Sequence, residues 1–203
     1  MKNALKFKII GALLFSMVFI STVQAQDPKM GIRAGVLISN QDFKSGNLDY
    51  NTDGKLGLDL ALVGDFPMGD VVSISPELHW LQKGSKFEDL GNTIGEVTST
   101  LNYLELPLML KLHFGGTDVA FMVFGGPSFG YLLDGKDKDH DGNTNDIDLD
   151  FYKRVEIGIH AGAGIMMGPA VIDVRYIYGV TNISDSEIEV RNNGLGAGIS
   201  LMF

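Results

Sequence analysis

The segment 137–148 has the most regular spacing of oxygen-bearing side chains in the chain. Such side chains stand at positions 1, 3, 5, 9 and 12 of this twelve-residue stretch, and Gly142 stands at position 6. In a calcium loop of this length, alternate side chains converge on one hard cation and the glycine permits a sharp turn. The candidate ligands are Asp137, Asp139, Asp141, Asn143 through its backbone carbonyl, Asn145 and Asp148.

Two features of this segment depart from a calcium loop. Position 12 is Asp148, which is shorter than the bidentate glutamate usual there, and no flanking helices are expected. Clusters of Asp, Asn and Gly are also common turn chemistry, so the alternative is a solvated acidic loop tip. We expect no other cofactor.

A second set of charged and imidazole side chains recurs at alternate positions within otherwise apolar segments. Its members are Arg33, Asp59, Glu77, His79, Glu105, Lys111, Arg154, Glu156, His160, Asp173 and Arg175. The four bases and five acids nearly balance, which suits ion pairs that share hydrogen bonds in a confined interior. The set is interpreted either as a structural network or as a path for protons or ions, and we prefer the first.

The chain carries no recognisable catalytic motif. It has no nucleophile elbow, no His-Glu-x-x-His and no phosphate-cradling glycine loop. The absence of cysteine excludes disulfides and thiolate sites, and a net charge of −9 argues against nucleic-acid binding. We therefore expect a protein that is not an enzyme.

Apolar and polar residues alternate with period two from Lys29 onward, which indicates β-strands. Eight segments carry the pattern: 29–38, 55–66, 71–82, 100–113, 119–131, 151–166, 171–181 and 194–203. Short connections at 67–70, 115–118 and 167–170 alternate with long polar ones at about 39–54, 83–99, 132–150 and 182–193. An up-and-down arrangement then gathers the short turns at one end and the long loops at the other, as in outer-membrane β-barrels.

The two faces of these strands differ in polarity. In 104–112, leucines alternate with a face that carries Glu105 and Lys111. The polar face is rich in glycine, which suits a narrow interior, and one Arg or Lys facing lipid at mid-bilayer costs roughly 2–4 kcal/mol. We therefore expect an all-β, eight-stranded antiparallel up-and-down transmembrane β-barrel, apolar outside, with a filled polar lumen. Bulges are expected to absorb Pro76, Pro107 and Pro127.

The first 25 residues differ from the rest of the chain. Three lysines precede an apolar run of about a dozen residues, and small residues end at Ala25. This predicts a cleaved signal peptide over 1–25 and a barrel domain over 26–203, exported to the outer membrane of a Gram-negative cell.

Several segments resemble one family. The strand from Tyr103 to Lys111 looks like the "YLEiPlllK" strand of the PorT-like outer-membrane β-barrels of Bacteroidota. Gly125 to Leu133 resembles that family's "GpyxgyLl" strand, and weaker matches follow Gly31 and Arg175. The resemblance implies an eight-stranded barrel, similar in design to OmpX and OmpA, mostly without assigned activity.

These observations predict an outer-membrane barrel of structural or interaction-mediating role with acidic outward loops. The alternatives are a binding or adhesion module that uses its loops with calcium, a narrow ion-conducting pore and, last, a lipid-modifying enzyme. The expected partners are outer-membrane lipid and lipopolysaccharide, whose phosphates the acidic loops would reach through divalent ions. Periplasmic chaperones and the barrel-assembly machinery are expected partners during biogenesis.

Overall fold

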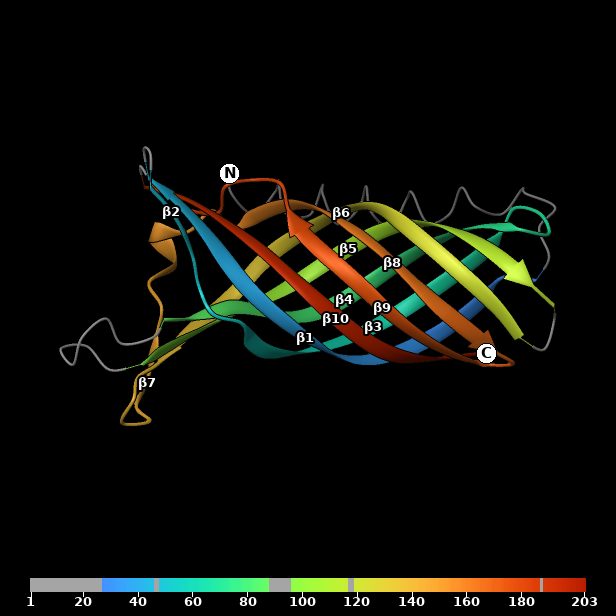
Figure 1. Cartoon of the computed structure of the whole chain (residues 1–203), viewed down its shortest axis with the longest axis horizontal. Helices are drawn as coiled ribbons and strands as arrows, with labels where there is room; N and C mark the ends of the chain where they lie inside the picture. The colour runs from blue at the N-terminus through green and yellow to red at the C-terminus, as the bar shows by residue number, and fades with distance from the viewer. Residues whose placement is uncertain (1–26, 46–47, 88–95, 117–118, 187) are drawn as a thin grey trace, which may run out of the picture.

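The fold is a closed ring of eight antiparallel strands (Figure 1). The computed structural model describes residues 27–45, 48–87, 96–116, 119–186 and 188–203, so the predicted signal peptide lies outside the described residues. The ring strands are β1 (Lys29–Ser45), β3 (Lys55–Pro67), β4 (Val72–Phe87), β5 (Val97–Gly115), β6 (Val119–Lys138), β8 (Val155–Met167), β9 (Ala170–Gly179) and β10 (Glu189–Met202). Each strand pairs with the next, and β10 closes the ring on β1 from Gly31↔Met202 to Lys44↔Glu189.

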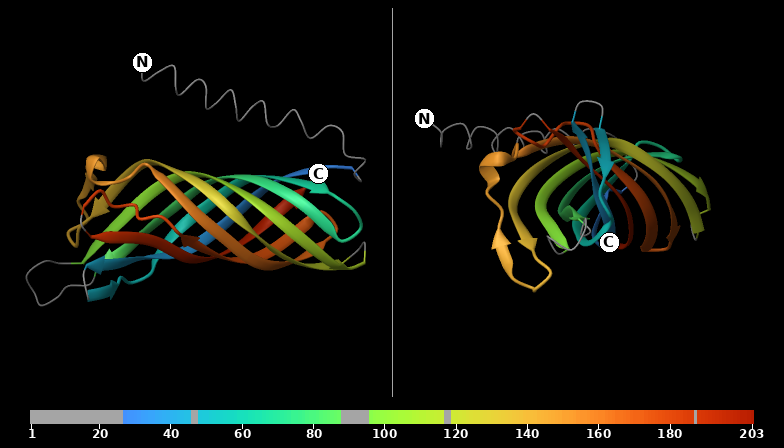
Figure 2. Two further views of the ribbon diagram at one scale, coloured as in Figure 1. Left: turned by 90° about the horizontal axis from the view of Figure 1, so that it is seen from above. Right: turned by 60° about the vertical axis from the view of Figure 1, so that its left-hand side comes forward.

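Three short elements lie outside the ring. Strand β2 (Leu48–Asn51) pairs with β1, strand β7 (Thr144–Asp146) pairs with β6, and η2 (Leu149–Phe151) is a turn of 3₁₀-helix. Figures 1 and 2 show β7 projecting beyond the ring at the end opposite the C-terminus. Within the described residues, no helix is both long and apolar enough to cross a membrane.

The connections alternate in length as the sequence predicted. The short turns join β3 to β4, β5 to β6 and β8 to β9, and Phe203 exchanges backbone hydrogen bonds with Met30 at the same end. The predicted loop 83–99 is wrong in its bounds, because β4 continues to Phe87 and β5 starts at Val97. Ser and Thr in that stretch suit a pleated strand, and their ladder runs from Lys83↔Leu101 to Phe87↔Val97.

The prolines do not shift the strand register. Pairing is interrupted beside Pro76 and Pro107, but the partners on both sides of each gap keep the same register. The expected bulges at these prolines are therefore wrong, since a missing donor interrupts the ladder without inserting a residue. The register shift lies instead between β5 and β6, where Asn102 pairs with Asp134 and Tyr103 with Leu132, so that Leu133 is the extra residue.

The two faces of the ring separate by polarity. The outward side chains are mainly Leu, Ile, Val and Phe, with exposures such as 67% for Leu56 and 55% for Leu62, whereas inward Arg33 and Asp59 are 3% and 1% exposed. The inward faces of β8 and β10 are rich in glycine: Gly158, Gly162 and Gly164 on β8, and Gly194, Gly196 and Gly198 on β10. A Cβ at Gly198 would overlap the guanidinium of Arg33 on the adjacent β1, so this glycine leaves room for a long side chain of the neighbouring strand.

Candidate functional site

Arg33 on β1 is the centre of the first group of interior charges. Its Nε and Nη2 donate to the two carboxylate oxygens of Asp173 on β9, at 3.0 and 2.9 Å, and its Nη1 donates to Asp59 on β3. The guanidinium is planar and matches the two oxygens of one carboxylate, which gives the paired hydrogen bonds to Asp173. One arginine thus links strands on both sides of the β1–β10 closure.

His79 on β4 lies between two carboxylates. Its Nδ1 is 2.6 Å from Asp59 Oδ1 and its Nε2 is 2.8 Å from Glu77 Oε2. Arg175 donates to the same Glu77 oxygen at 2.9 Å and to Asp173 at 3.0 Å. Both carboxylates accept hydrogen bonds from the imidazole only when the ring carries hydrogen on both nitrogens. The three acids are then matched by two arginines and one imidazolium.

Lys83 is the centre of a second group, nearer the long-loop end. Its Nζ lies 2.8 Å from Glu105 Oε2 and 3.2 Å from Glu156 Oε2, and 4.9 Å from the centre of the Tyr103 ring. His160 Nε2 is 2.8 Å from the other oxygen of Glu105, and Asn192 donates to Glu156 at 3.1 Å. A primary ammonium has three donors and no fixed plane, so it bridges two carboxylates of different strands.

Most of the sequence-predicted interior set is placed in these two groups. Ten of its members are 0–7% exposed, and Lys111 lies 3.4 Å from Glu77. The predicted interior position of Arg154 is wrong. Strand β8 starts only at Val155, so Arg154 precedes the strand and is exposed. Its guanidinium lies 3.5 and 3.4 Å from the backbone carbonyls of Leu132 and Leu133. Sequence reasoning missed Lys83, although it has the same parity as Glu77 and His79; a strand extended past residue 82 would have included it.

Apolar layers border the charged groups along the ring. The cluster of Ala61, Val63, Met109, Met122, Phe124, Val171 and Met202 involves strand segments that lead to the short turns. A second cluster, next to the long loops, comprises Leu101, Tyr103, Leu132, Ile183 and Val190. Ile147, Leu149 and Tyr152 pack on this second cluster from the connection between β7 and β8. That connection therefore adds apolar side chains to the cluster at the long-loop end of the ring.

The predicted calcium ligands do not converge. Residues 136–138 pair with 144–146 as a β-hairpin, so the segment is strand and tight tip instead of a twelve-residue loop. Asp139 accepts hydrogen bonds from the backbone and side-chain amides of Asn143, at 2.8 and 3.1 Å, and Asp148 caps η2. In the part of the chain that the structure describes, no three His, Cys, Asp or Glu side chains are placed to hold a metal ion.

A serine, a histidine and an aspartate lie close together at the end of the ring that carries the short turns. Ser73 Oγ donates to Asp65 at 2.6 Å and lies 2.9 Å from His113 Nε2, beside an open hollow of about 880 Å³. In a hydrolase triad the serine proton faces the histidine, and the carboxylate orients the second ring nitrogen. Here the serine proton faces the carboxylate and His113 Nδ1 has no hydrogen-bond partner among the described residues, so this geometry is not that of an activated nucleophile.

Comparison with known proteins identifies the family. Residues 24–185 match the family described as outer membrane protein beta-barrel domain. The chain belongs to this outer-membrane β-barrel family. No curated protein matches the chain at a significant level.

The chain is also similar to solved structures of other proteins. A major outer membrane protein of Thermus thermophilus is 13% identical, with a TM-score of 0.50 over 88% of this chain and 100% of that one. Neisserial surface protein A is 11% identical over 88% and 100% of the two chains, with a TM-score of 0.48. Ail, the attachment invasion locus protein of Yersinia pestis, is 16% identical over 87% and 100%, with a TM-score of 0.42.

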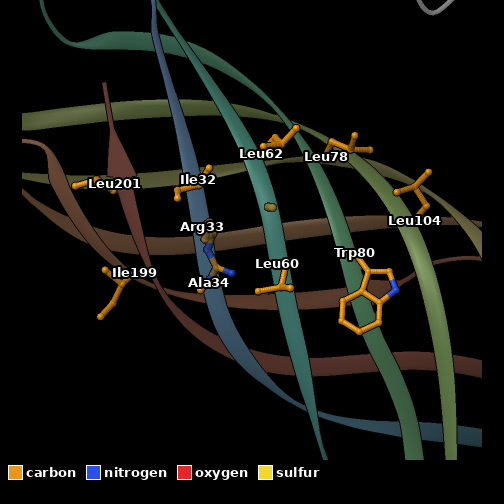
Figure 3. Close-up of a pocket in the computed structure, with 11 residues that line it drawn as sticks. Ile32, Arg33, Ala34, Leu60, Leu62, Leu78, Trp80, Leu104, Ile199 and Leu201 are labelled. Carbon is orange, nitrogen blue, oxygen red and sulfur yellow. The ribbon is translucent and has the colours of Figure 1, made fainter.

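Membership of this family places the barrel in the outer membrane, and the outer face of the ring is apolar. On that face lies a shallow hollow of about 620 Å³, lined by Ile32, Ala34, Leu60, Trp80 and Ile199 among others (Figure 3). Small Ala34 lies between larger neighbours, so the surface dips there. Arg33 adjoins the hollow through its backbone, while its guanidinium belongs to the interior ion pairs.

Proposed function

We propose that the protein is a closed, non-conducting and non-catalytic barrel that acts as a structural or interaction-mediating component of the outer membrane. One observation carries this proposal: ion pairs cross the interior between strands on several sides of the ring, and apolar layers lie between them and its ends. Eight strands leave an interior just wide enough for side chains. A permeant ion would have to separate buried ion pairs, at about 3–5 kcal/mol for each broken pair.

Planar-bilayer recording of the refolded barrel tests the closed interior. We expect no stable conductance steps from the unmodified protein. A triple variant, Met109→Ala, Met122→Ala and Phe124→Ala, removes apolar bulk from the layer near the short turns and is expected to raise the frequency of brief current events. A second triple variant, Leu60→Ala, Leu62→Ala and Phe121→Ala, removes similar bulk from the outer face and serves as the matched control. Large, long-lived steps from the unmodified protein would overturn the proposal.

The remaining partners follow from this membrane location. We propose that residues 1–25 direct export and are removed, and that periplasmic chaperones and the barrel-assembly machinery act on the mature chain. Outer-membrane lipid then surrounds the leucine-rich face, and lipopolysaccharide surrounds its outer half. Kinship with the PorT-like barrels of Bacteroidota rests on the strand motif from Tyr103 to Lys111.

Loop-mediated binding is the second candidate function, and the β6–β7 hairpin favours it. The hairpin extends beyond the ring (Figure 2), and its tip exposes Asp141 beside Asp139. Such a tip suits a cationic partner. Cells that display the barrel are expected to adhere to immobilised polylysine. The double variant Asp139→Asn and Asp141→Asn is expected to weaken that adhesion. Replacing Lys136 and Lys138 with Gln in the same hairpin should strengthen it; equal adhesion by all three would exclude the hairpin.

A further inference from the structure

Three buried polar atoms on the β6–β8 wall have no hydrogen-bond partner among the described residues. They are Ser128 Oγ, Glu156 Oε1 and His160 Nδ1, in residues that are 4%, 1% and 0% exposed. Buried polar atoms are almost always paired, with protein or with ordered water, because an unpaired one costs about 1–3 kcal/mol. Three such atoms in one region therefore point to a bound group.

The register brings the three residues that carry these atoms around two glycines. Gly158 of β8 pairs across the ladder with Ser128 of β6 on one side and with Gly179 of β9 on the other. A Cβ at Gly158 would lie 2.8 Å from Ser128 Oγ, and a Cβ at Gly179 would lie 2.3 Å from Glu156 Oε1. Glu156 and His160 flank Gly158 on the same inward face, two residues away in each direction. The paired glycines thus form a floor without side chains beneath polar atoms.

The hydrogen-bonding capacity of these atoms defines the occupant. His160 Nε2 is 2.8 Å from Glu105 Oε1, and a carboxylate only accepts, so Nε2 carries the hydrogen and a neutral ring offers a lone pair at Nδ1. Glu156 Oε1 is a second acceptor, while the Ser128 hydroxyl can donate. An occupant that donates two hydrogen bonds and accepts one satisfies all three atoms.

We propose that one water molecule occupies the site above Gly158 and Gly179, donating to Glu156 Oε1 and His160 Nδ1 and accepting from Ser128 Oγ. This water completes an unbroken hydrogen-bonded chain from Glu156 through His160 to Glu105, the two carboxylates that Lys83 bridges. It also fixes His160 as the neutral tautomer with hydrogen on Nε2. The site is independent of whether the barrel conducts ions or binds partners through its loops.

NMR of the full mature barrel, refolded in detergent micelles with ¹⁵N-labelled histidine, tests the proposal. The His160 resonances are assigned by their loss in His160→Gln. We expect a ring with hydrogen on Nε2 alone, and a long-lived cross-relaxation signal between its Hε1 proton and water. A His160 ring with hydrogen on both nitrogens, or on Nδ1 alone, would overturn the assignment.

Variants separate the site from a general effect on the interior. Ser128→Ala removes the donor to the water and is expected to abolish the water signal at His160. Ser200→Ala makes the same change at another inward-facing buried serine, on β10, and is expected to leave the signal intact. Gel mobility without heating reports whether each variant is folded. A signal unchanged by Ser128→Ala, or one that appears only in ammonium buffer as a cross-peak to ¹⁵N-ammonium, would refute the water site.

Discussion

Replacement of Arg33 by methionine tests whether the interior ion pairs stabilise the barrel. The substitution keeps an unbranched side chain but leaves Asp59 and Asp173 without the guanidinium that contacts both. Removing one partner of a buried ion pair costs about 3–5 kcal/mol. Here Asp59 keeps His79 and Asp173 keeps Arg175, so we expect a loss of about 3 kcal/mol in the free energy of unfolding. With a urea m-value of about 2 kcal/mol/M, the midpoint falls by about 1.5 M.

Urea unfolding of the barrel in lipid vesicles measures this loss, with fluorescence of the single tryptophan as the signal. Arg154→Met is the matched control, because it makes the same change at an exposed arginine and is expected to stay within about 0.5 kcal/mol of the unmodified protein. Adding Asp173→Asn to Arg33→Met removes one uncompensated charge and should recover part of the stability. The reasoning fails if Arg33→Met matches Arg154→Met, or if the double variant loses the full sum of both single losses.

Four further predictions concern the lipid face, the glycine wall and the hairpin tip. Leu60→Arg should destabilise the barrel by roughly 2–4 kcal/mol in the same urea assay, because its charge would face acyl chains. Gly198→Ala should cost about 1–3 kcal/mol, since the new methyl overlaps an interior guanidinium. Trp80 fluorescence should be quenched by lipids brominated along the acyl chain. The amides of Asn143 hold the pKa of Asp139 below its ordinary value, so an NMR titration of Asn143→Ala should raise that pKa. The tip hydrogen bonds, present above the ordinary aspartate range, should be lost only as the pH falls through the depressed pKa.

Each of these predictions has a control or an opposing outcome. Gly116→Ala adds a methyl where no heavy atom lies within 4 Å, and should leave the unfolding midpoint nearly unchanged. An outward arginine tolerated as well as leucine at position 60 would mean that this face does not meet lipid. The same conclusion would follow if Trp80 were quenched by aqueous acrylamide and not by bromolipids. If Asp139 titrates identically with and without the Asn143 side chain, the hydrogen bonds at the hairpin tip do not lower its pKa.

The sequence predicted the ring because period-two alternation and alternating loop lengths are local signals that strand pairing does not alter. Leucines from Leu104 to Leu112 specify one face of β5 wherever the strand lies in the ring. The strand ends were harder to predict. Polar residues such as Ser85 and Ser99 look like loop in isolation and become strand only because the neighbouring strand continues beside them.

The candidate site, like the fold, could be predicted from the sequence only in part. Inward parity placed Arg33, Glu77 and Asp173 in the interior set, but which acid meets which base depends on how far each strand is displaced relative to the next. The calcium hypothesis depended on one-dimensional spacing. In the structure the ladder of β6 continues through Asp137 and the residues at the tip hydrogen-bond to each other, so the spacing along the chain does not bring these side chains to one point.

A charged interior need not be a channel, because long side chains on some strands fill the space over glycines on others. An eight-stranded ring has room for roughly one large side chain at each level. Arg33 on β1 lies over Gly198 on the adjacent β10, and Phe124 on β6 lies over Gly162 on the adjacent β8, so a long side chain occupies the space that a glycine of the neighbouring strand leaves. Charge then provides cross-links and not a lining, because the guanidinium groups of Arg33 and Arg175 end on carboxylates instead of in open water. A protein filled in this way can act on its surroundings only through its surface. Its interactions are therefore to be sought on the leucine-rich outer face and at the end of the ring where the β6–β7 hairpin projects.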